Sequence, residues 1–187
     1  MIYLFSALDT ISDQDFQRAL HLLPPSRREY ALHFRRIEDQ KRTVIGYLLL
    51  LYGLRHEYGI TGCPDIVPAP SGKPYLTGKN MPFFSISHSG KYVGCALHSA
   101  EIGLDIQETV SIRPALVRRV CTDREQSLIK TDEDFCRLWT RKESVSKLTE
   151  EGISGDFQNI LDLHPEFVTT SHPLEGGRYY LSYSVQK

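Results

Sequence analysis

The sequence has few of the features that mark zinc-binding, disulfide-bonded or membrane-spanning proteins. Only four of its 187 residues are cysteine, and no two of them lie close enough together to form a zinc-binding pair. We therefore expect no zinc site, and we expect the four thiols to be reduced packing residues of a cytoplasmic protein: Cys63, Cys95, Cys121 and Cys136. The longest apolar run, residues 47–52, is too short to cross a membrane.

A strong net charge is also absent. The formal net charge of -1 gives no global attraction for nucleic acid or an anionic membrane, and no motif interleaves aromatic and basic residues as nucleic-acid-binding modules do. The opening MIYLFSALDT has no basic segment before its apolar run, so we expect a first strand rather than a targeting signal. The length fits one domain, or two small halves that share a core. We expect a monomer that binds neither nucleic acid nor membranes.

The order of the hydrophobic patterns predicts an α+β protein with two similar halves. Proline and glycine in residues 59–80 predict a loop, and residues 99–101 predict a turn after which residues 102–106 return as the second arm of a hairpin. We expect Ser111 to cap a helix with a proline in its first turn, and Thr122 to open a capping box. The other predicted strands are residues 2–8, 83–87, 91–98 and 178–185, and the other predicted helices are residues 13–22, 26–34, 38–58 and 132–149.

Two carboxylates stand in unusual surroundings. Asp105 lies in IGLDI, among apolar residues and glycine, where an unpaired buried acid would be costly. The alternative for Asp105 is an edge-strand acid that faces water. Glu143 lies in LWTRKESVSKL, where Trp139, Glu143 and Lys147 share one helix face. An exposed Glu–Lys pair is the simpler explanation of that spacing alone, although a tryptophan on the same stripe argues against full exposure.

Other residues suit the binding of an anion. His88 in FSISHSG lies in a turn that offers hydroxyls, an imidazole and backbone N–H groups. The alternatives are a surface turn, or a nucleophile–base pair of Cys95 and His88, for which no oxyanion elbow or third member is visible. Lys73 in SGKPY is held in a turn that proline stiffens. The basic residues between positions 27 and 42 alternate with acids, so they form either phosphate contacts or a solvated face.

These groups together indicate one kind of site. Two acids suit a hard cation such as Mg2+, which prefers oxygen ligands and often completes its shell with water and substrate phosphates. The lysine and histidine turns suit a ligand that carries several phosphates. The pattern is that of a site for transfer chemistry at a pyrophosphate.

The motifs FSISHSG, IGLDI and WTRKESVSK, in this order, resemble the three signature blocks of the Sfp-type 4'-phosphopantetheinyl transferases. SGKPY resembles a further block of that family, and LPPSRREYALHFRRIEDQKRTVIG resembles its N-terminal helical region. The similarity covers residues 1–150, beyond which only a generic strand pattern remains. Each block alone is weak, whereas four blocks in order at family-like spacing are specific.

The resemblance implies an enzyme that moves 4'-phosphopantetheine from coenzyme A to a serine of an acyl or peptidyl carrier protein and releases 3',5'-ADP. It implies a pseudo-dimeric α+β fold whose halves, residues 1–98 and 99–187, hold coenzyme A and Mg2+ (or Mn2+) between them. Asp105 and Glu143 would bind the metal, with Glu143 also the base for the serine, and Lys147 would contact the pyrophosphate or help to expel the leaving group. The implied contacts to coenzyme A are Arg27, Arg42, Thr43, Lys73, Ser87, His88 and Lys147.

One position departs from the family pattern. Where an acid is common two residues after the aspartate, this chain has Gln107, whose amide oxygen can still ligate Mg2+, directly or through water, but cannot act as a base. A binding module without turnover and a phosphate-ester hydrolase therefore stay open as alternatives. Residues 111–120 follow the Asp105 strand and are expected to dock the carrier, although some of their apolar side chains can instead face the core. The expected docking residues are Arg113, Leu116, Val117, Arg118, Arg119 and Val120.

Overall fold

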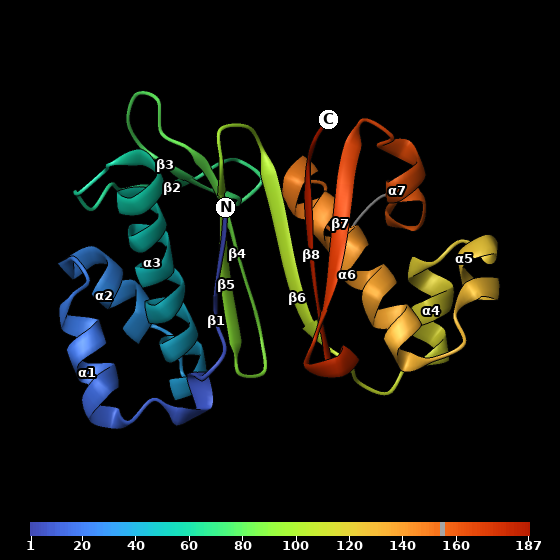
Figure 1. Cartoon of the computed structure of the whole chain (residues 1–187), viewed down its shortest axis with the longest axis horizontal. Coiled ribbons are helices and arrows are strands. Elements are labelled where there is room, and N and C mark those ends of the chain that lie inside the picture. The colour runs from blue at the N-terminus through green and yellow to red at the C-terminus, as the bar shows by residue number, and fades with distance from the viewer. Residues whose placement is uncertain (154–155) are drawn as a thin grey trace.

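The computed structural model describes residues 1–153 and 156–187 and shows an α+β architecture of two similar halves side by side (Figure 1). Each half is a three-stranded antiparallel sheet with helices packed on it. The strand order is β1-β5-β4 in the first half and β6-β8-β7 in the second. The predicted fold class is therefore confirmed.

The elements of the first half have these bounds: β1 (Ile2–Phe5), η1 (Leu8–Thr10), α1 (Asp13–His21), α2 (Pro25–Leu32), α3 (Ile37–Tyr58), β2 (Ile66–Pro68), β3 (Pro74–Leu76), β4 (Phe83–Ser89) and β5 (Tyr92–His98). Those of the second half are β6 (Ile102–Glu108), α4 (Pro114–Val120), α5 (Asp123–Leu128), α6 (Asp132–Thr149), η2 (Phe157–Asn159), α7 (Ile160–Leu163), β7 (Phe167–Leu174), η3 (Glu175–Gly177) and β8 (Tyr179–Gln186).

The long helix α3 organises the first core. Its buried residues Val44, Leu50 and Leu54 belong to one apolar cluster with Leu97 of β5. Gly53 lets the helix approach the sheet, because a Cβ there would lie 2.5 Å from the Leu97 side chain. Burying such side chains contributes about 1.5–3 kcal/mol each, so this face holds α3 in place.

The second half is built around α6, which packs on the sheet through hydroxyl groups rather than through an apolar face. Thr140 of α6 shares a hydrogen bond of 2.7 Å with Ser182 of β8, and Ser144 shares one of 2.7 Å with Ser184. All four side chains are fully buried. Small polar side chains on both surfaces bring the helix close to the strands, and the paired hydroxyls satisfy one another.

A row of serine side chains joins the two sheets. The Oγ of Ser85 on β4 accepts from the backbone N–H of Leu104 on β6 at 3.0 Å. Ser87 accepts from the N–H of Ile106 at 3.0 Å, and Ser89 accepts from the N–H of Glu108 at 2.8 Å. The edge strands β4 and β6 therefore face each other with side-chain hydroxyls in place of a backbone ladder.

Removing one rung of this row should destabilise the fold. In Ser85→Ala the buried N–H of Leu104 loses its partner, and an unsatisfied buried donor costs about 1–3 kcal/mol. Urea unfolding should show a free energy of unfolding lower by that amount, with a correspondingly lower midpoint. Ser127→Ala is the control, since Ser127 is exposed and bonds only within its own helix turn. Equal midpoints for both variants would mean that the row contributes nothing.

Several sequence expectations are wrong. The strand at residues 102–106 is not the second arm of a hairpin with β5: it pairs with β8, so the chain changes sheets at the turn. Helix α4 has Arg113 at its N-cap, without a side-chain bond, and Ser111 does not cap it. The expected loop at residues 59–80 contains the small β2–β3 hairpin. The first strand ends at Phe5.

Two further features differ from or extend the expectations. Strand β7 was not predicted, because FVTTSHPL mixes polar residues and a proline without clear alternation. It forms a strand at the edge of the sheet by pairing with β8. All four cysteines are free, as expected, but Cys63 is exposed and is not a packing residue. The capping box at Thr122 is confirmed. No helix in residues 1–153 and 156–187 combines the length and apolar character needed to cross a membrane.

Candidate active site

The two predicted acids converge at the contact between β6 and α6. Asp105 lies in the middle of β6 and is buried, and Glu143 lies on α6 and is half-buried. One oxygen of Asp105 accepts from Lys147 Nζ at 2.7 Å and from Ser87 Oγ at 3.0 Å. The strand, the helix and the seam with β4 thus fix Asp105 from three sides.

The close approach of α6 to β6 depends on glycine. A Cβ at Gly103 would lie 1.8 Å from the backbone oxygen of Ser144, which is far inside contact distance. Because Ser144 is the neighbour of Glu143, the missing side chain at position 103 sets the distance between the two acids. This explains why IGLDI has glycine two residues before its aspartate.

The electrostatics of the pair favour a cation. The pKa of Glu143 is raised, first by burial and then by the nearby charge of Asp105, while Lys147 opposes the shift. Asp105 Oδ2 and Glu143 Oε1 are both buried and have no hydrogen-bond partner in the protein. Two buried, unpartnered oxygens on acids that repel each other are unfavourable unless a positive ion or a donor reaches them.

These oxygens fit a hard divalent cation such as Mg2+. The described residues contain no group of three or more His, Cys, Asp or Glu side chains that could hold a metal, so the protein offers two carboxylates here. Gln107 follows Asp105 on the same strand face and is half-buried, and its amide donates to the carbonyl of Glu108 at 3.2 Å. Its amide oxygen is a third, uncharged oxygen atom of the kind that can ligate Mg2+.

Glu143 opens onto a cleft of about 320 Å3 between the halves. Lys147 and the predicted Lys73 line the same cleft, as do Phe84 and Ile86 from β4. Asp105 sits behind Lys147, to which it is bonded. The volume of the cleft lies at the lower end of the range for small-molecule sites, which is about 300–1,000 Å3. Acids, lysines and an apolar wall therefore meet in one concave site.

The predicted Lys73 bridges the two halves. Its ammonium forms an ion pair with Glu101 and donates to the carbonyl of Leu148 at 3.1 Å. The same SGKPY turn places Ser71 and Tyr75 against Glu150, whose carboxylate accepts from both hydroxyls. Sequence reasoning missed this cluster, because nothing in the order of residues indicates that the turn reaches the end of α6.

A second positive group lies at the seam between α3 and the turn after β4. Arg42 bonds Asp39 at 2.8 Å and the carbonyl of Gly90 at 3.3 Å, and its Nε is buried without a partner. The pKa of His88 is lowered, mainly by desolvation and then by the charges of Arg42 and Lys147. His88 therefore lies close to two positive side chains, Arg42 and Lys147.

The remaining residues predicted to contact coenzyme A are Arg27 and Thr43. Arg27 stacks over the rings of Tyr30 at 4.6 Å and Tyr47 at 5.1 Å, and burial lowers its pKa. Thr43 donates to the carbonyl of Asp39 at 2.8 Å, one turn earlier in α3. These contacts leave the guanidinium of Arg27 half-buried between aromatic rings, with an Nε that has no partner.

Ser87 differs from the other predicted contacts to coenzyme A because it is the one that is fully buried, and its hydroxyl is engaged inside the protein. The residue is 5% exposed and bonds Asp105, the N–H of Ile106 and Lys147 Nζ at 3.0 Å. The sequence could show that a serine precedes His88, but not that strand β6 lies across from it.

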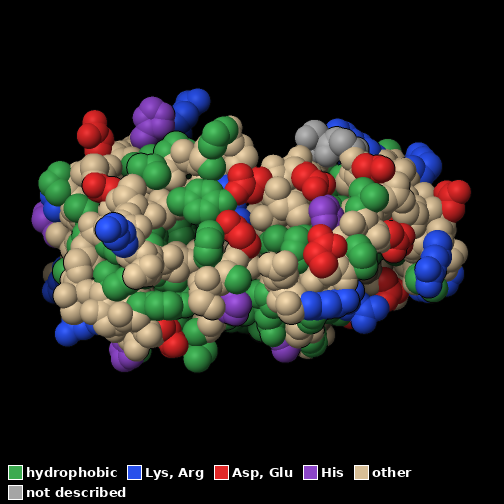
Figure 2. All heavy atoms as spheres, turned by 90° about the horizontal axis from the view of Figure 1, so that it is seen from above, with side chains coloured by type: hydrophobic (Ala, Val, Ile, Leu, Met, Phe, Trp, Pro, Cys, Tyr) green, Lys and Arg blue, Asp and Glu red, His purple; other side chains and the backbone are tan. Residues whose placement is uncertain are grey.

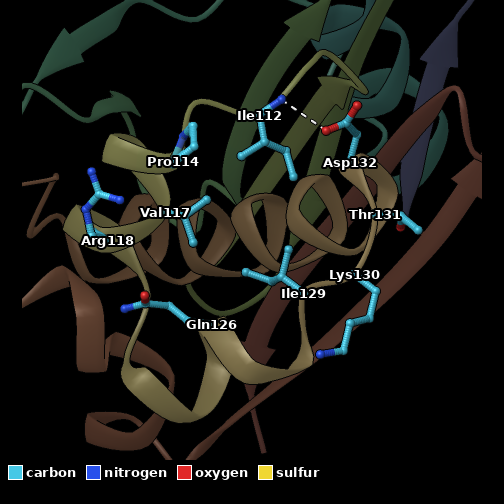
Figure 3. Close-up of a pocket in the computed structure, with 9 residues that line it drawn as sticks. All are labelled: Ile112, Pro114, Val117, Arg118, Gln126, Ile129, Lys130, Thr131 and Asp132. Carbon is cyan, nitrogen blue, oxygen red and sulfur yellow. Dashed lines mark hydrogen bonds between the residues drawn. The ribbon is translucent and has the colours of Figure 1, made fainter.

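The predicted docking segment forms α4 on the outer side of the second half. Its three arginines are exposed, whereas Leu116 and Val117 are half-buried against the core. Val120 is 1% exposed, so its assignment as a docking residue is wrong, and it packs in the core instead. Between α4 and α5 lies a groove of about 700 Å3 (Figure 3). Its lining residues are Ile112, Pro114, Val117, Arg118, Gln126, Ile129, Lys130, Thr131 and Asp132.

Comparisons with known proteins match both halves of the chain. A family model described as the 4'-phosphopantetheinyl transferase superfamily matches residues 101–185, and one described as 4'-phosphopantetheinyl transferase, N-terminal, matches residues 10–100. The 4'-phosphopantetheinyl transferase Sfp of Bacillus subtilis (strain 168) is 31% identical over 151 residues, which cover 77% of this chain and 67% of Sfp.

Two further relatives carry the same description. The 4'-phosphopantetheinyl transferase psf-1 of Bacillus pumilus is 30% identical over 158 residues, covering 79% of this chain and 68% of psf-1. The 4'-phosphopantetheinyl transferase AcpT of Escherichia coli O157:H7 is 31% identical over 137 residues, covering 67% of this chain and 64% of AcpT. With both halves matched and the motif acids brought together where β6 meets α6, the chain belongs to the 4'-phosphopantetheinyl transferase superfamily and is an enzyme of that class.

Proposed function

We propose that this enzyme transfers 4'-phosphopantetheine from coenzyme A to a serine of an apo carrier protein, depends on Mg2+ and releases 3',5'-ADP. The observation that carries the proposal is the pair of buried, unpartnered oxygens on Asp105 and Glu143, next to Lys147 and to the cleft that Glu143 and Lys147 line. The relatives' names support the transfer reaction.

Asp105 and Glu143 would hold the metal ion, with Gln107 as a third ligand, directly or through water. Mg2+, or Mn2+ in its place, supplies positive charge for the phosphate oxygens when it is bound. Glu143 takes the proton from the carrier serine, and the raised pKa of its carboxyl suits a base near neutral pH. The serine oxygen bonds to the β-phosphorus as the bond to 3',5'-ADP breaks, and Lys147 offsets the charge on the leaving oxygen.

Residues 1–98 then provide the coenzyme A site and residues 99–187 the metal, the catalytic groups and the carrier-docking surface. We assign Arg27, Arg42, Thr43, Lys73 and His88 to the phosphates and the adenylate end. Ser87 is better explained as the residue that holds Asp105, because its hydroxyl is buried and fully engaged. The exposed side chains of α4 offer the positive charge that an acidic carrier would meet: Arg113, Arg118 and Arg119.

An intact-mass assay tests the function. Protein, Mg2+, coenzyme A and a panel of apo carriers should yield a carrier heavier by one phosphopantetheine group, with an equal amount of 3',5'-ADP, and EDTA should stop both. Release of 3',5'-ADP without any carrier would indicate the phosphate-ester hydrolase. Tight binding of coenzyme A with neither product would indicate the binding module.

Gln107, the uncharged residue proposed as the third metal ligand, yields a separate prediction. If water can replace the amide of Gln107, Gln107→Ala should retain substantial activity, within about tenfold of the parent. Gln107→Glu adds a negative ligand and should lower the Mg2+ concentration needed for half-maximal rate. Titrating Mg2+ against initial rate measures both effects. Complete loss of activity in Gln107→Ala would assign an essential role to the amide.

A further inference from the structure

Lys142 is a charged residue that the transfer reaction proposed above does not use. It stands in the motif WTRKES, directly before Glu143, and its side chain is fully buried. A lysine is almost never fully buried unless its ammonium is paired, because taking a charge out of water is unfavourable. The groups that hold this ammonium therefore indicate what the lysine does.

Both partners of the ammonium lie outside α6. Lys142 Nζ forms an ion pair of 2.7 Å with Glu125 of α5 and donates to the carbonyl of Gln158 in η2. The same oxygen of Glu125 accepts from the N–H of Thr122 at 2.8 Å, a bond that belongs to the capping box of α5. One buried lysine thus ties the start of α5 to the helix that carries Glu143.

The second partner extends this connection to α4. The side-chain amide of Gln158 donates to the carbonyl of Arg118, in the last turn of α4, at 2.8 Å. Lys142 is therefore bonded, directly or through Gln158, to both helices that flank the groove of about 700 Å3 (Figure 3). Arg118 and Lys130 line that groove and are exposed. Figure 2 shows basic side chains, with acidic ones among them, at this outer end of the second half.

Lys142 and Glu143 leave α6 on different sides. Adjacent residues of an α-helix are turned by about 100° relative to each other, since the helix has 3.6 residues per turn. Glu143 lines the reaction cleft, whereas Lys142 bonds α5 and η2. Without the lysine, α4 and α5 lose bonds that hold them to α6, and the surface proposed to meet the carrier is less preorganised. The coenzyme A contacts assigned to the first half are not involved.

We infer that Lys142 is a positioning residue for the carrier protein. Through Glu125 and Gln158 it fixes the surface of α4 and α5 relative to Glu143, and it thereby determines the KM for the carrier but not the binding of coenzyme A. The inference rests on the proposed function, since it takes the carrier to dock on this surface. Charged hydrogen bonds fix a geometry because they are directional, whereas apolar burial is not.

Three variants separate position from stability. Lys142→Met leaves the carboxylate of Glu125 without its partner. Glu125→Gln leaves the buried ammonium unpaired, while its amide oxygen can still accept from the N–H of Thr122. Each should lower the melting temperature, because removing one member of a buried ion pair leaves an uncompensated charge. The double variant removes both charges and should melt close to the parent, although the directional bonds of Lys142 stay lost.

The kinetic expectation is the same for all three variants. The KM for the carrier should rise about tenfold, and the dissociation constant of coenzyme A should stay within about twofold of the parent value. Initial rates against carrier concentration and titration of coenzyme A with Mg2+ measure the two quantities, at a temperature at which the proteins are folded. Leu54→Ala is the control: it destabilises the core of the first half and should change neither constant.

Where a single variant does not fold, the double variant provides the comparison. A double variant with the parental melting temperature and the parental carrier KM would mean that Lys142 serves stability alone, and the inference would be overturned while transfer stands. Carrier and coenzyme A constants that rise together overturn it as well. Titration of the carrier without turnover separates the inference from the proposed function. A carrier dissociation constant that the double variant raises, without transfer by the parent to any carrier, supports Lys142 and contradicts the proposed function.

Discussion

Glu143→Gln should lower kcat by about a thousandfold or more and should not lower the melting temperature. Glutamine keeps the size of the side chain but cannot take the proton of the carrier serine, and general base catalysis alone contributes roughly 10²–10⁴-fold. In the proposed site, the substitution also removes one of the two charged oxygen ligands for the metal. The loss should therefore appear in kcat, together with a higher Mg2+ requirement.

The stability of this variant has a predictable sign. Because the folded protein raises the pKa of Glu143 above its unfolded value, the ionised carboxylate is penalised in the fold. That penalty is absent below the unfolded pKa and grows as the pH rises through the folded pKa. In EDTA, Glu143→Gln and the parent should melt alike near pH 4, and the variant should melt higher near pH 8.

The control for this experiment is Glu133→Gln, which should leave the rate unchanged and lower the melting temperature only slightly, because Glu133 is an exposed acid in the first turn of α6. If Glu143→Gln retains near-normal turnover, Glu143 is neither base nor metal ligand. If it melts below the parent at neutral pH, the carboxylate has a stabilising partner that the structure does not show.

The sequence predicts the local parts of this site well. Asp105, Glu143 and Lys147 stand in motifs whose residue types have chemical meaning, and the structure brings all three together. Both helices that carry site residues also follow from periodicity, because α3 and α6 are long and α6 carries a capping box at Thr131. Whether a long periodic segment forms a helix or a strand depends on residues that are close to one another in the sequence.

The non-local parts could not be predicted. Strand β6 pairs with β8, more than seventy residues later, and nothing in either segment identifies the other as its partner. The same limit applies to Ser87, whose bond to Asp105 exists only because two sheet edges meet. Glu150 follows a helix in the sequence like any polar residue, and only its backbone conformation and its contacts with the SGKPY turn distinguish it.

Gly103→Ala should be the most damaging conservative change in the second half. The added methyl carbon would overlap the backbone oxygen of Ser144 at 1.8 Å, and a helix backbone cannot rotate away as a side chain can. Helix α6 must therefore move outward, which breaks the buried hydroxyl pair of Ser144 and Ser184. Overpacking of this kind costs about 1–3 kcal/mol, and occasionally more.

The same displacement carries Glu143 away from Asp105, because Glu143 and Ser144 are adjacent on α6. A shift of about 1 Å in a reacting group costs roughly 100-fold in rate, so Gly103→Ala should lose activity even at temperatures where it stays folded. Gly62→Ala is the matched control, since a Cβ there meets nothing within 4 Å. Thermal melts and initial rates at saturating coenzyme A separate the two effects. A Gly103→Ala enzyme with parental stability and parental rate would show that α6 and β6 do not need this close contact, and the distance between the two acids would then have to be set elsewhere.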